Sequence, residues 1–388
     1  MGTVSLLADV AGEMIVPVLP LFLTITLGAP PSAVGLVEGS AELAASLFRA
    51  VGGWWSDRVG RRKPTVVFGY ALSALAKPAL ALAGAWPAVL FVRFLDRTGK
   101  GLRGSARDAL IASSVEKEHW GRAFGLHRAM DTAGAVAGPL VAFALMQAGG
   151  FSYRAVFAAA SVPALASVLV LVLFVREAHE VVPSSPPPAA AHADRPPLPP
   201  TFWRFLLIYG LFALGNSSDS FILLKARATG MASGAVIAAY AIFNLVNACL
   251  APGLGRLADR VGRRLLVATG LAVYAFCYAG FARASSPASI WPLFALYGLY
   301  AALVEGSFRA VVSGFSVEGN RGTAHGVFQS VAGVLGFAAS VLAGVLWSKA
   351  GPAWVFWFGA ACAALSSAAL FSAVGSSFGG SSSSPSRP

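Results

Sequence analysis

Charge is scarce in this chain: only 12% of its 388 residues are Asp, Glu, Lys or Arg, whereas a soluble domain carries roughly 25%. A surface in contact with water needs more charge than this, which excludes an ordinary soluble fold. Apolar residues make up 56% of the chain, and the mean hydropathy is +0.69, so most of the surface must face lipid. Because a helix needs about 20 apolar residues to cross a bilayer, the length allows roughly a dozen spans.

Cysteine is also scarce. Cys249, Cys277 and Cys362 lie far apart in apolar stretches, a spacing that fits neither a disulfide framework nor a metal site. The chain has no phosphate-binding Gly-rich loop, so we do not expect ATP as the energy source. No combination of nucleophile, base and metal ligands emerges, and we expect neither an enzyme nor a bound cofactor. The first apolar run has no basic segment before it, so we interpret it as a helix that stays in the mature protein.

The charge that is present is mostly positive, with 29 basic and 17 acidic residues. The basic residues stand at the ends of apolar runs, so membrane topology explains them and no nucleic-acid partner is expected. Two loops are the most basic, and they carry Arg58, Arg61, Arg62 and Lys63, and Arg256, Arg260, Arg263 and Arg264. Basic loops face the cytoplasm. With an even number of spans, both termini are therefore predicted to be cytoplasmic, in a protein of the cytoplasmic (inner) membrane.

Twelve apolar runs predict an all-α integral membrane protein. The expected helices are 3–28, 33–55, 64–84, 87–113, 121–148, 153–175, 202–225, 232–255, 264–283, 289–314, 322–348 and 353–374. Residues 177–201 hold eight of the 23 prolines and are predicted to be a cytoplasmic Pro/Ala-rich linker. They separate two six-helix units, 1–176 and 202–374, and residues 375–388 are expected to be a disordered tail.

The two halves repeat each other. The segment from Asp57 to Arg62 recurs 202 positions later, from Asp259 to Arg264, and the Gly121 to Gly125 segment has a looser counterpart that begins at Gly322. An internal duplication of six helices predicts two pseudo-symmetric bundles around a central site, which is the layout that alternating access uses.

The first repeated loop, from Gly53 to Pro64, resembles the signature loop of the major facilitator superfamily, and its second copy stands where that family has a degenerate repeat. The resemblance implies a gating latch that holds the cytoplasmic side closed, with Asp57 and Arg61 as the main pair. A carboxylate at a helix end can pair with guanidinium groups and bind a helix N-terminus. The alternative is that the arginines only fix topology. The latch residues are Gly53, Asp57, Arg58, Gly60, Arg61 and Arg62, with Gly255, Asp259, Arg260, Gly262 and Arg263 as the weaker copy.

The predicted helix 87–113 is unusually charged. Its spacings of 3, 4, 3 and 4 place five charges within roughly an 80° arc: Arg93, Asp96, Lys100, Arg103 and Arg107. Arg97 lies just off this arc and matches the basic position of the family's fourth-helix motif, from which Lys100 and Arg103 depart. Charges at membrane depth are costly, which makes them candidates for a substrate cavity.

Acidic partners are available in the same half. Asp9 and Glu13 share one face of the first helix, Glu38 and Glu42 share one face of the second, and Asp131 lies in the fifth. Eight basic residues, Lys77 among them, oppose seven acidic ones in these helices, so the set can be a structural charge network. Alternatively, some pairs exchange partners during transport. Asp9 and Glu13 are then the expected proton carriers, because a carboxylate removed from water can bind a proton in the working pH range.

The predicted fifth helix contains Gly134 and Gly138 at a spacing of four, followed by Pro139. Small residues at this spacing allow close helix packing, and the proline bends the helix. The pattern resembles the fifth-helix motif of antiporters in the same family, and simple packing explains it equally well.

These features predict a secondary transporter that exports small organic molecules by alternating access in exchange for protons. Its expected partners are a small-molecule substrate, protons and membrane lipid, and the fold needs only one chain. One alternative is a proton-coupled symporter of an anionic solute, since a cationic cavity attracts anions. A second alternative, from another class, is a non-transporting membrane sensor with the same fold.

Overall fold

The computed structural model describes residues 1–59, 62–176, 197–315 and 320–378, and these residues contain no β-strand. The predicted all-α fold is confirmed. The elements are α1 (Gly2–Ile15), α2 (Leu19–Leu21), the π-helical turn η1 (Phe22–Thr26), α3 (Pro31–Val59), α4 (Arg62–Leu82), α5 (Trp86–Ser113), the 3-10 turn η2 (Lys117–His119), α6 (Trp120–Gln147), α7 (Tyr153–Phe174), α8 (Pro200–Gly215), α9 (Ser220–Ala228), α10 (Ser233–Val261), α11 (Arg263–Arg283), α12 (Pro287–Gly314), α13 (Arg321–Ala350) and α14 (Pro352–Phe378).

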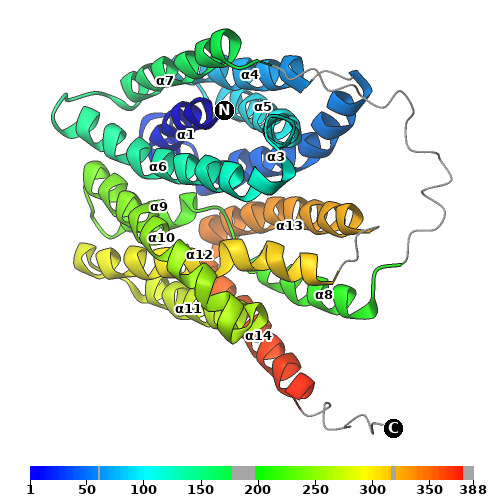
Figure 1. Cartoon of the computed structure of the whole chain (residues 1–388). Coiled ribbons are helices and arrows are strands. Elements are labelled where there is room, and N and C mark those ends of the chain that lie inside the picture. Colours follow the sequence, from blue (N-terminus) through cyan, green and yellow to red (C-terminus); the bar gives the residue numbers. More distant parts are fainter. Residues whose placement is uncertain (60–61, 177–196, 316–319, 379–388) are drawn as a thin grey trace, which may run out of the picture.

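The helices form two bundles, α1 to α7 and α8 to α14, which lie above and below each other in Figure 1. The N-terminal bundle has one larger apolar cluster, which includes Phe22 and Phe157. Two small apolar clusters lie around its charged interior. The C-terminal bundle is held by one large cluster rich in Phe and Tyr. Although the two halves repeat each other in sequence, the interior of the N-terminal bundle is therefore charged and that of the C-terminal bundle is aromatic.

Two predicted helices are interrupted. The first is split near Pro17 and Pro20 into α1, α2 and η1, because proline cannot donate the backbone hydrogen bond of a helix interior. The prediction of one continuous helix over 202–225 is wrong: α8 ends at Gly215 and α9 starts at Ser220. The segment between them begins with Asn216 and continues with two serines and Asp219, residues whose side chains compete for backbone hydrogen bonds.

Within the described part of the chain, ten helical segments are long and apolar enough to cross a membrane. The helices α3 and α5 complete the twelve predicted spans although they are too polar for that criterion. Glu38 and Glu42 lower the hydropathy of α3, and α5 carries five cations and two carboxylates within its length. Charged residues are costly in lipid; those of α5 line the candidate site described below, and Glu38 of α3 pairs with one of them.

Helix bounds differ from the expectation at two places. Helix α8 begins at Pro200 rather than 202, because proline is accommodated in the first turn of a helix. Helix α14 continues to Phe378, so residues 375–378 are helical where a tail was expected. The rest of the predicted linker and tail, 177–196 and 379–388, lies outside the described residues.

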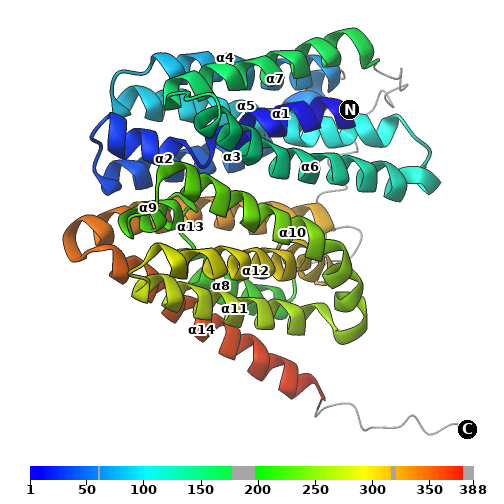
Figure 2. The ribbon, with the colours of Figure 1, turned by 90° about the vertical axis from the view of Figure 1, so that its left-hand side faces the viewer.

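The bundles have two ends. The α3–α4 and α10–α11 junctions and the N-terminus lie at one end, which we call the basic end, and the η1–α3, α4–α5 and α6–α7 junctions lie at the other, the opposite end (Figure 2). The bundles contact each other toward the opposite end. There α3 packs on α13 with glycines at the crossing: a β-carbon at Gly39 would lie 3.0 Å from the Phe337 carbonyl oxygen, and one at Gly344 would lie 2.8 Å from the Ser32 Cα. The Tyr153 and Ser233 hydroxyls add a hydrogen bond of 2.7 Å between the bundles.

Candidate functional site

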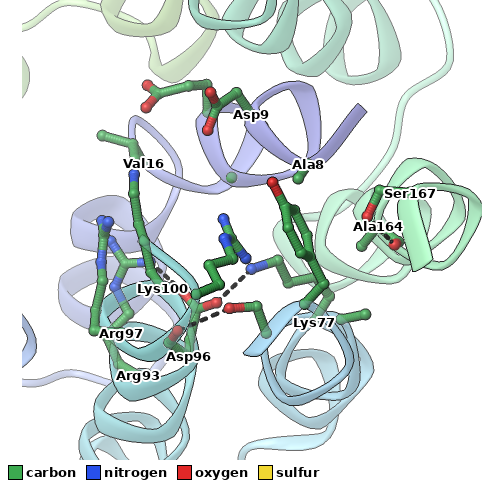
Figure 3. Close-up of a pocket in the computed structure, with 16 residues that line it drawn as sticks. Ala8, Asp9, Val16, Lys77, Arg93, Asp96, Arg97, Lys100, Ala164 and Ser167 are labelled. Carbon is green, nitrogen blue, oxygen red and sulfur yellow. Dashed lines mark hydrogen bonds and ion pairs between the residues drawn. The ribbon is translucent and has the colours of Figure 1, made fainter. Parts of the chain in front are cut away.

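A polar pocket lies inside the N-terminal bundle, between α1, α4, α5 and α7 (Figure 3). Most of its polar lining is charged, and apolar contact comes mainly from small residues of α1, α4 and α7. The ionisable and hydroxyl-bearing residues that line it are Asp9, Glu13, Tyr70, Ser73, Lys77, Arg93, Asp96, Arg97, Lys100, Arg103 and Ser167.

Asp96 is the centre of a buried ion cluster. Its carboxylate accepts a 2.6 Å bond from the Lys77 Nζ of α4 and a 3.0 Å bond from the Arg93 Nη1 one turn away on α5, and Figure 3 shows the two cations converging on it. Arg93 also lies 3.5 Å from the Glu38 carboxylate of α3. Arg93 is only 1% exposed, so these four charges, two of each sign, neutralise one another where water does not reach.

A second group faces the pocket from α1. The Lys100 ammonium lies within electrostatic range of the Asp9 and Glu13 carboxylates, and Arg97 acts on Glu13 from the same helix. Glu13 also accepts a 3.3 Å hydrogen bond from the Tyr240 hydroxyl of α10. This carboxylate therefore touches both bundles, and α1 places it on the same helix face as Asp9.

The glycines of α6 pack against these carboxylates. A β-carbon at Gly138 would lie 2.6 Å from the Glu13 Cβ, and one at Gly134 would lie 3.0 Å from the Asp9 Cβ. Pro139 is buried beside them inside α6. The close approach of α6 to α1 is thus centred on the two predicted proton carriers.

The remaining charges of α5 follow its buried face toward the basic end. The Arg103 guanidinium stacks on the Tyr70 ring with 4.1 Å to the ring centroid, a cation–π contact. Arg107 donates a 3.1 Å bond to the Ser5 hydroxyl and lies 3.9 Å from the Asp131 carboxylate of α6. Arg93, Arg103 and Arg107 of the basic stripe thus each contact an acceptor or a ring.

Glu42 lies apart from this set. Its side chain is exposed and lies 3.7 Å from the β-carbon position of Gly336 on α13. Glu38 and Glu42 therefore separate, although they are one turn apart: Glu38 joins the ion cluster, and Glu42 faces the C-terminal bundle.

The predicted latch residues are placed only in part. Gly60 and Arg61 lie outside the described residues, and Asp57 lies in α3 with a side chain that is not described. Arg58 lies over the Trp54 ring at 5.2 Å, and Arg62 donates a 3.0 Å bond to the Ala109 carbonyl near the end of α5. Gly53 is in ordinary contact with Ser105.

The second copy of the latch is a local pair. Arg263 donates a 3.1 Å bond to Asp259, and both side chains are about half exposed or more. Gly262 has a φ of +93° between α10 and α11, a conformation that glycine adopts without strain. Arg260 is exposed, and a β-carbon at Gly255 would have no atom within 4 Å, so this glycine makes no close helix contact.

Three features of the site were missed or undervalued from the sequence. The charge balance of the first half gives Lys77 no specific role, although a lone lysine inside an apolar run signals a buried partner. Tyr70 and Tyr240 carry no charge and no motif, so only the structure brings them to the site. Gly52, next to the predicted Gly53, is the glycine at which α3 approaches α5, since a β-carbon there would collide with Leu102. Within the described ranges, no group of three or more His, Cys, Asp or Glu side chains is placed to hold a metal ion.

Comparison with known proteins agrees with this architecture. The family model of the Major Facilitator Superfamily matches residues 1–340 and 205–384. An uncharacterized MFS-type transporter of Methanocaldococcus jannaschii is 34% identical over 94% of this chain and 92% of its own length. The multi-drug resistance efflux pump PmrA of Streptococcus pneumoniae is 26% identical over 74% of this chain and 73% of its own. Among solved structures, a mutant of the nucleoside transporter NupG shares the fold with a TM-score of 0.78 and 14% identity, covering 96% of this chain and 98% of that one.

Proposed function

The chain belongs to the Major Facilitator Superfamily, and from that premise we propose that it exports small organic molecules across the cytoplasmic membrane in exchange for protons. Membership makes it a multi-pass membrane transporter rather than an enzyme. We propose the direction of transport, the coupling ion and the roles of individual residues.

The observation that carries the proposal is the position of Glu13. Its carboxylate shares the pocket with Lys100 and Arg97, and it accepts a hydrogen bond from Tyr240 of the other bundle. An ionised Glu13 accepts a charge-assisted hydrogen bond, which a neutral acid accepts less strongly. Proton binding would therefore weaken a contact between the bundles and at the same time change the charge of the pocket. Asp9, one turn away, provides a second carboxylate for the same step.

Export is favoured by the relative PmrA, whose name describes a multi-drug resistance efflux pump. Exchange for protons supplies the energy for such export: Glu13 would bind a proton from the outside after the substrate has left and release it to the cytoplasm before the next substrate binds, so that one proton moves inward down its gradient in each cycle. Alternating access requires that the two events occur in different conformations.

The orientation in the membrane is also proposed. The basic end carries Arg58, Arg62 and Lys63 in one bundle and Arg260, Arg263 and Arg264 in the other, and the positive-inside rule places these residues in the cytoplasm. The N-terminus and the end of α14 then face the cytoplasm. The packed opposite end faces outward, so the structure corresponds to a state that is closed on the outside.

A second candidate, symport of an anionic solute with protons, is favoured by the charge of the pocket. Five cations line it, Lys77, Arg93, Arg97, Lys100 and Arg103, against three carboxylates, Asp9, Glu13 and Asp96. A cationic excess attracts carboxylates or phosphates. In this alternative Lys100 is the main contact for the solute, because Lys77 and Arg93 are bound to Asp96.

Transport by the purified protein in liposomes with an imposed pH gradient tests the proposal. Lipophilic cations and organic anions are supplied in separate panels, and the flux of both solute and protons is recorded. We expect solute to leave the cytoplasm-equivalent side while protons enter, and we expect this exchange to be lost in Glu13→Gln and strongly reduced in Asp9→Asn. The matched control is Glu116→Gln, whose side chain is 82% exposed and does not line the pocket.

The other outcomes discriminate between the alternatives. Movement of an organic anion in the same direction as protons, abolished in Lys100→Ala, supports symport. Absence of flux across both panels supports the membrane sensor. If Glu13→Gln and Asp9→Asn both keep gradient-driven transport, these carboxylates are not the coupling site.

A further inference from the structure

The break between α8 and α9 places polar groups in the apolar core of the C-terminal bundle. Neighbouring helices hold the broken segment in a defined shape. The Tyr274 hydroxyl of α11 donates a 3.2 Å bond to the Gly215 carbonyl at the end of α8, and the Ser218 N–H donates a 3.2 Å bond to the Ser340 hydroxyl of α13. A helix interruption at membrane depth that is fixed by its neighbours is the kind of backbone that lines a binding site.

Asp219 is the charged group of this break. Its carboxylate accepts a 2.7 Å bond from the Tyr297 hydroxyl of α12. The hydroxyls of Tyr240, Tyr274 and Tyr278 lie within electrostatic range of the same carboxylate, from α10 and α11. One hydroxyl thus contacts this carboxylate directly, and three more hydroxyls from α10 and α11 lie within electrostatic range of it.

Two buried oxygens of the break lack a well-aligned hydrogen bond among the described residues, although they lie close to each other and to the Tyr274 hydroxyl. They are the Ser217 Oγ and the Tyr278 hydroxyl; Ser217 is 5% exposed and Tyr278 is completely buried. Buried hydroxyls are almost always well satisfied, so hydroxyls that face each other with poor alignment mark a place where a bound ion would complete their contacts. The Tyr278 ring is held in place by stacking on the Tyr274 ring, with 4.0 Å between the centroids.

We propose that the α8–α9 break is a binding site for a monovalent cation, Na⁺ or a proton, with Asp219 as its counter-charge and the hydroxyls of Ser217 and Tyr278 as further oxygen ligands. One carboxylate matches a single positive charge. The described residues hold no cluster of three or more carboxylate, imidazole or thiol groups, which a bound divalent metal would favour.

This site goes beyond the proposed exchange at Glu13, because it lies in the other bundle and its occupancy is measurable without transport. Tyr240 connects the two places: it donates to Glu13, and it lies within electrostatic range of Asp219. A cation at Asp219 would therefore act on the residue that joins the bundles.

The test is thermal unfolding of the purified full-length protein in detergent, with NaCl compared with choline chloride at equal ionic strength. If the ion is Na⁺, the wild-type melting temperature rises with NaCl. The midpoint concentration for this rise should increase at least about tenfold in Asp219→Asn, since a charge-assisted contact is lost. The control Asp259→Asn removes an exposed carboxylate from the same bundle and should keep the wild-type response. Ser217→Ala and Tyr278→Phe should weaken the response several-fold, and they preserve the test if Asp219→Asn does not fold.

A proton is detected by a second arm. Infrared difference spectra between acid and alkaline pH should contain a carboxylic-acid C=O band that is absent in Asp219→Asn and present in Asp259→Asn. An Asp219-dependent NaCl response assigns the site to Na⁺, and an Asp219-dependent infrared band without a NaCl response assigns it to a proton. If neither signal depends on Asp219, Ser217 or Tyr278, the proposal is wrong. Either result is independent of whether Glu13→Gln abolishes transport.

Discussion

Gly138 of α6 lies directly against Glu13 of α1, so that a β-carbon at Gly138 would come within 2.6 Å of the Glu13 Cβ. One turn earlier, Gly134 has the same relationship with Asp9. The spacing of four between the glycines matches the spacing of four between the carboxylates. The two patterns, which look unrelated in the sequence, are the two sides of one helix contact.

The first prediction concerns this contact. Gly138→Ala adds a methyl group where there is no space, and overpacking of this kind costs about 1–3 kcal/mol. We expect a lower melting temperature and reduced proton-driven transport, because α1 and Glu13 must move away from α6. Thermal unfolding and the liposome assay measure the two effects.

Gly125→Ala is the matched control for Gly138→Ala. Gly125 lies on the same helix, and a β-carbon there would meet no atom within 4 Å. Alanine favours a helix over glycine by about 1 kcal/mol, so Gly125→Ala should be neutral or slightly stabilising. If the two variants have equal melting temperatures and equal transport rates, the close approach of α6 to α1 does not contribute to stability or transport.

The second prediction concerns the contact between bundles at Tyr240. Tyr240→Phe removes the hydroxyl that donates to Glu13, and a hydrogen bond to a charged group contributes about 1.5–3 kcal/mol. We expect the dependence of transport on the pH gradient to weaken about tenfold, since 1.4 kcal/mol corresponds to a factor of ten. Initial rates at a series of imposed gradients give this dependence.

Tyr153→Phe distinguishes the loss of the contact with Glu13 from the loss of any contact between the bundles. It also removes a hydroxyl contact between the bundles, the 2.7 Å bond with Ser233, but it touches no carboxylate. Its transport should keep the wild-type response to the gradient. If both variants lose that response equally, loss of any contact between the bundles explains the result and Glu13 is not special.

The all-α architecture and its duplication could be predicted from the sequence, because the period of apolar runs and the repeated Asp259 loop are local signals. The break at Asn216 was not predicted, because the apolar residues on both sides favour one continuous helix and outweigh the local signal of Asn216, two serines and Asp219. The charge stripe of α5 was predicted from helix periodicity. The pairing of these charges was not predicted, because Lys77 reaches Asp96 from a different helix and Glu42 turns toward the other bundle. Contacts of this kind depend on how helices distant in sequence are placed.

The third prediction concerns the buried ion cluster. Lys77→Met removes one cation from Asp96, whose side chain is 7% exposed, and loss of one partner of a buried pair costs about 3–5 kcal/mol. We therefore expect a large drop in melting temperature. Arg263→Gln breaks the exposed pair with Asp259, which should cost about 1 kcal/mol or less. A similar small loss for both variants would mean that water or Arg93 compensates for the absent lysine.

The last prediction concerns the latch at the basic end. In this conformation the second copy is engaged locally, since Asp259 pairs with Arg263 one turn away, and the bundles contact each other toward the opposite end. The latch would then form only in the other conformation, when the basic end closes. Asp57→Asn should reduce transport severely without lowering the amount of membrane-inserted, monodisperse protein, because the family resemblance assigns this charge to a latch that forms during the transport cycle. Asp259→Asn should reduce transport less, because the second loop has Leu265 where the first has Lys63. Transport rates normalised to the inserted protein make the comparison. Normal transport by Asp57→Asn would leave the arginines of these loops with topology as their only role.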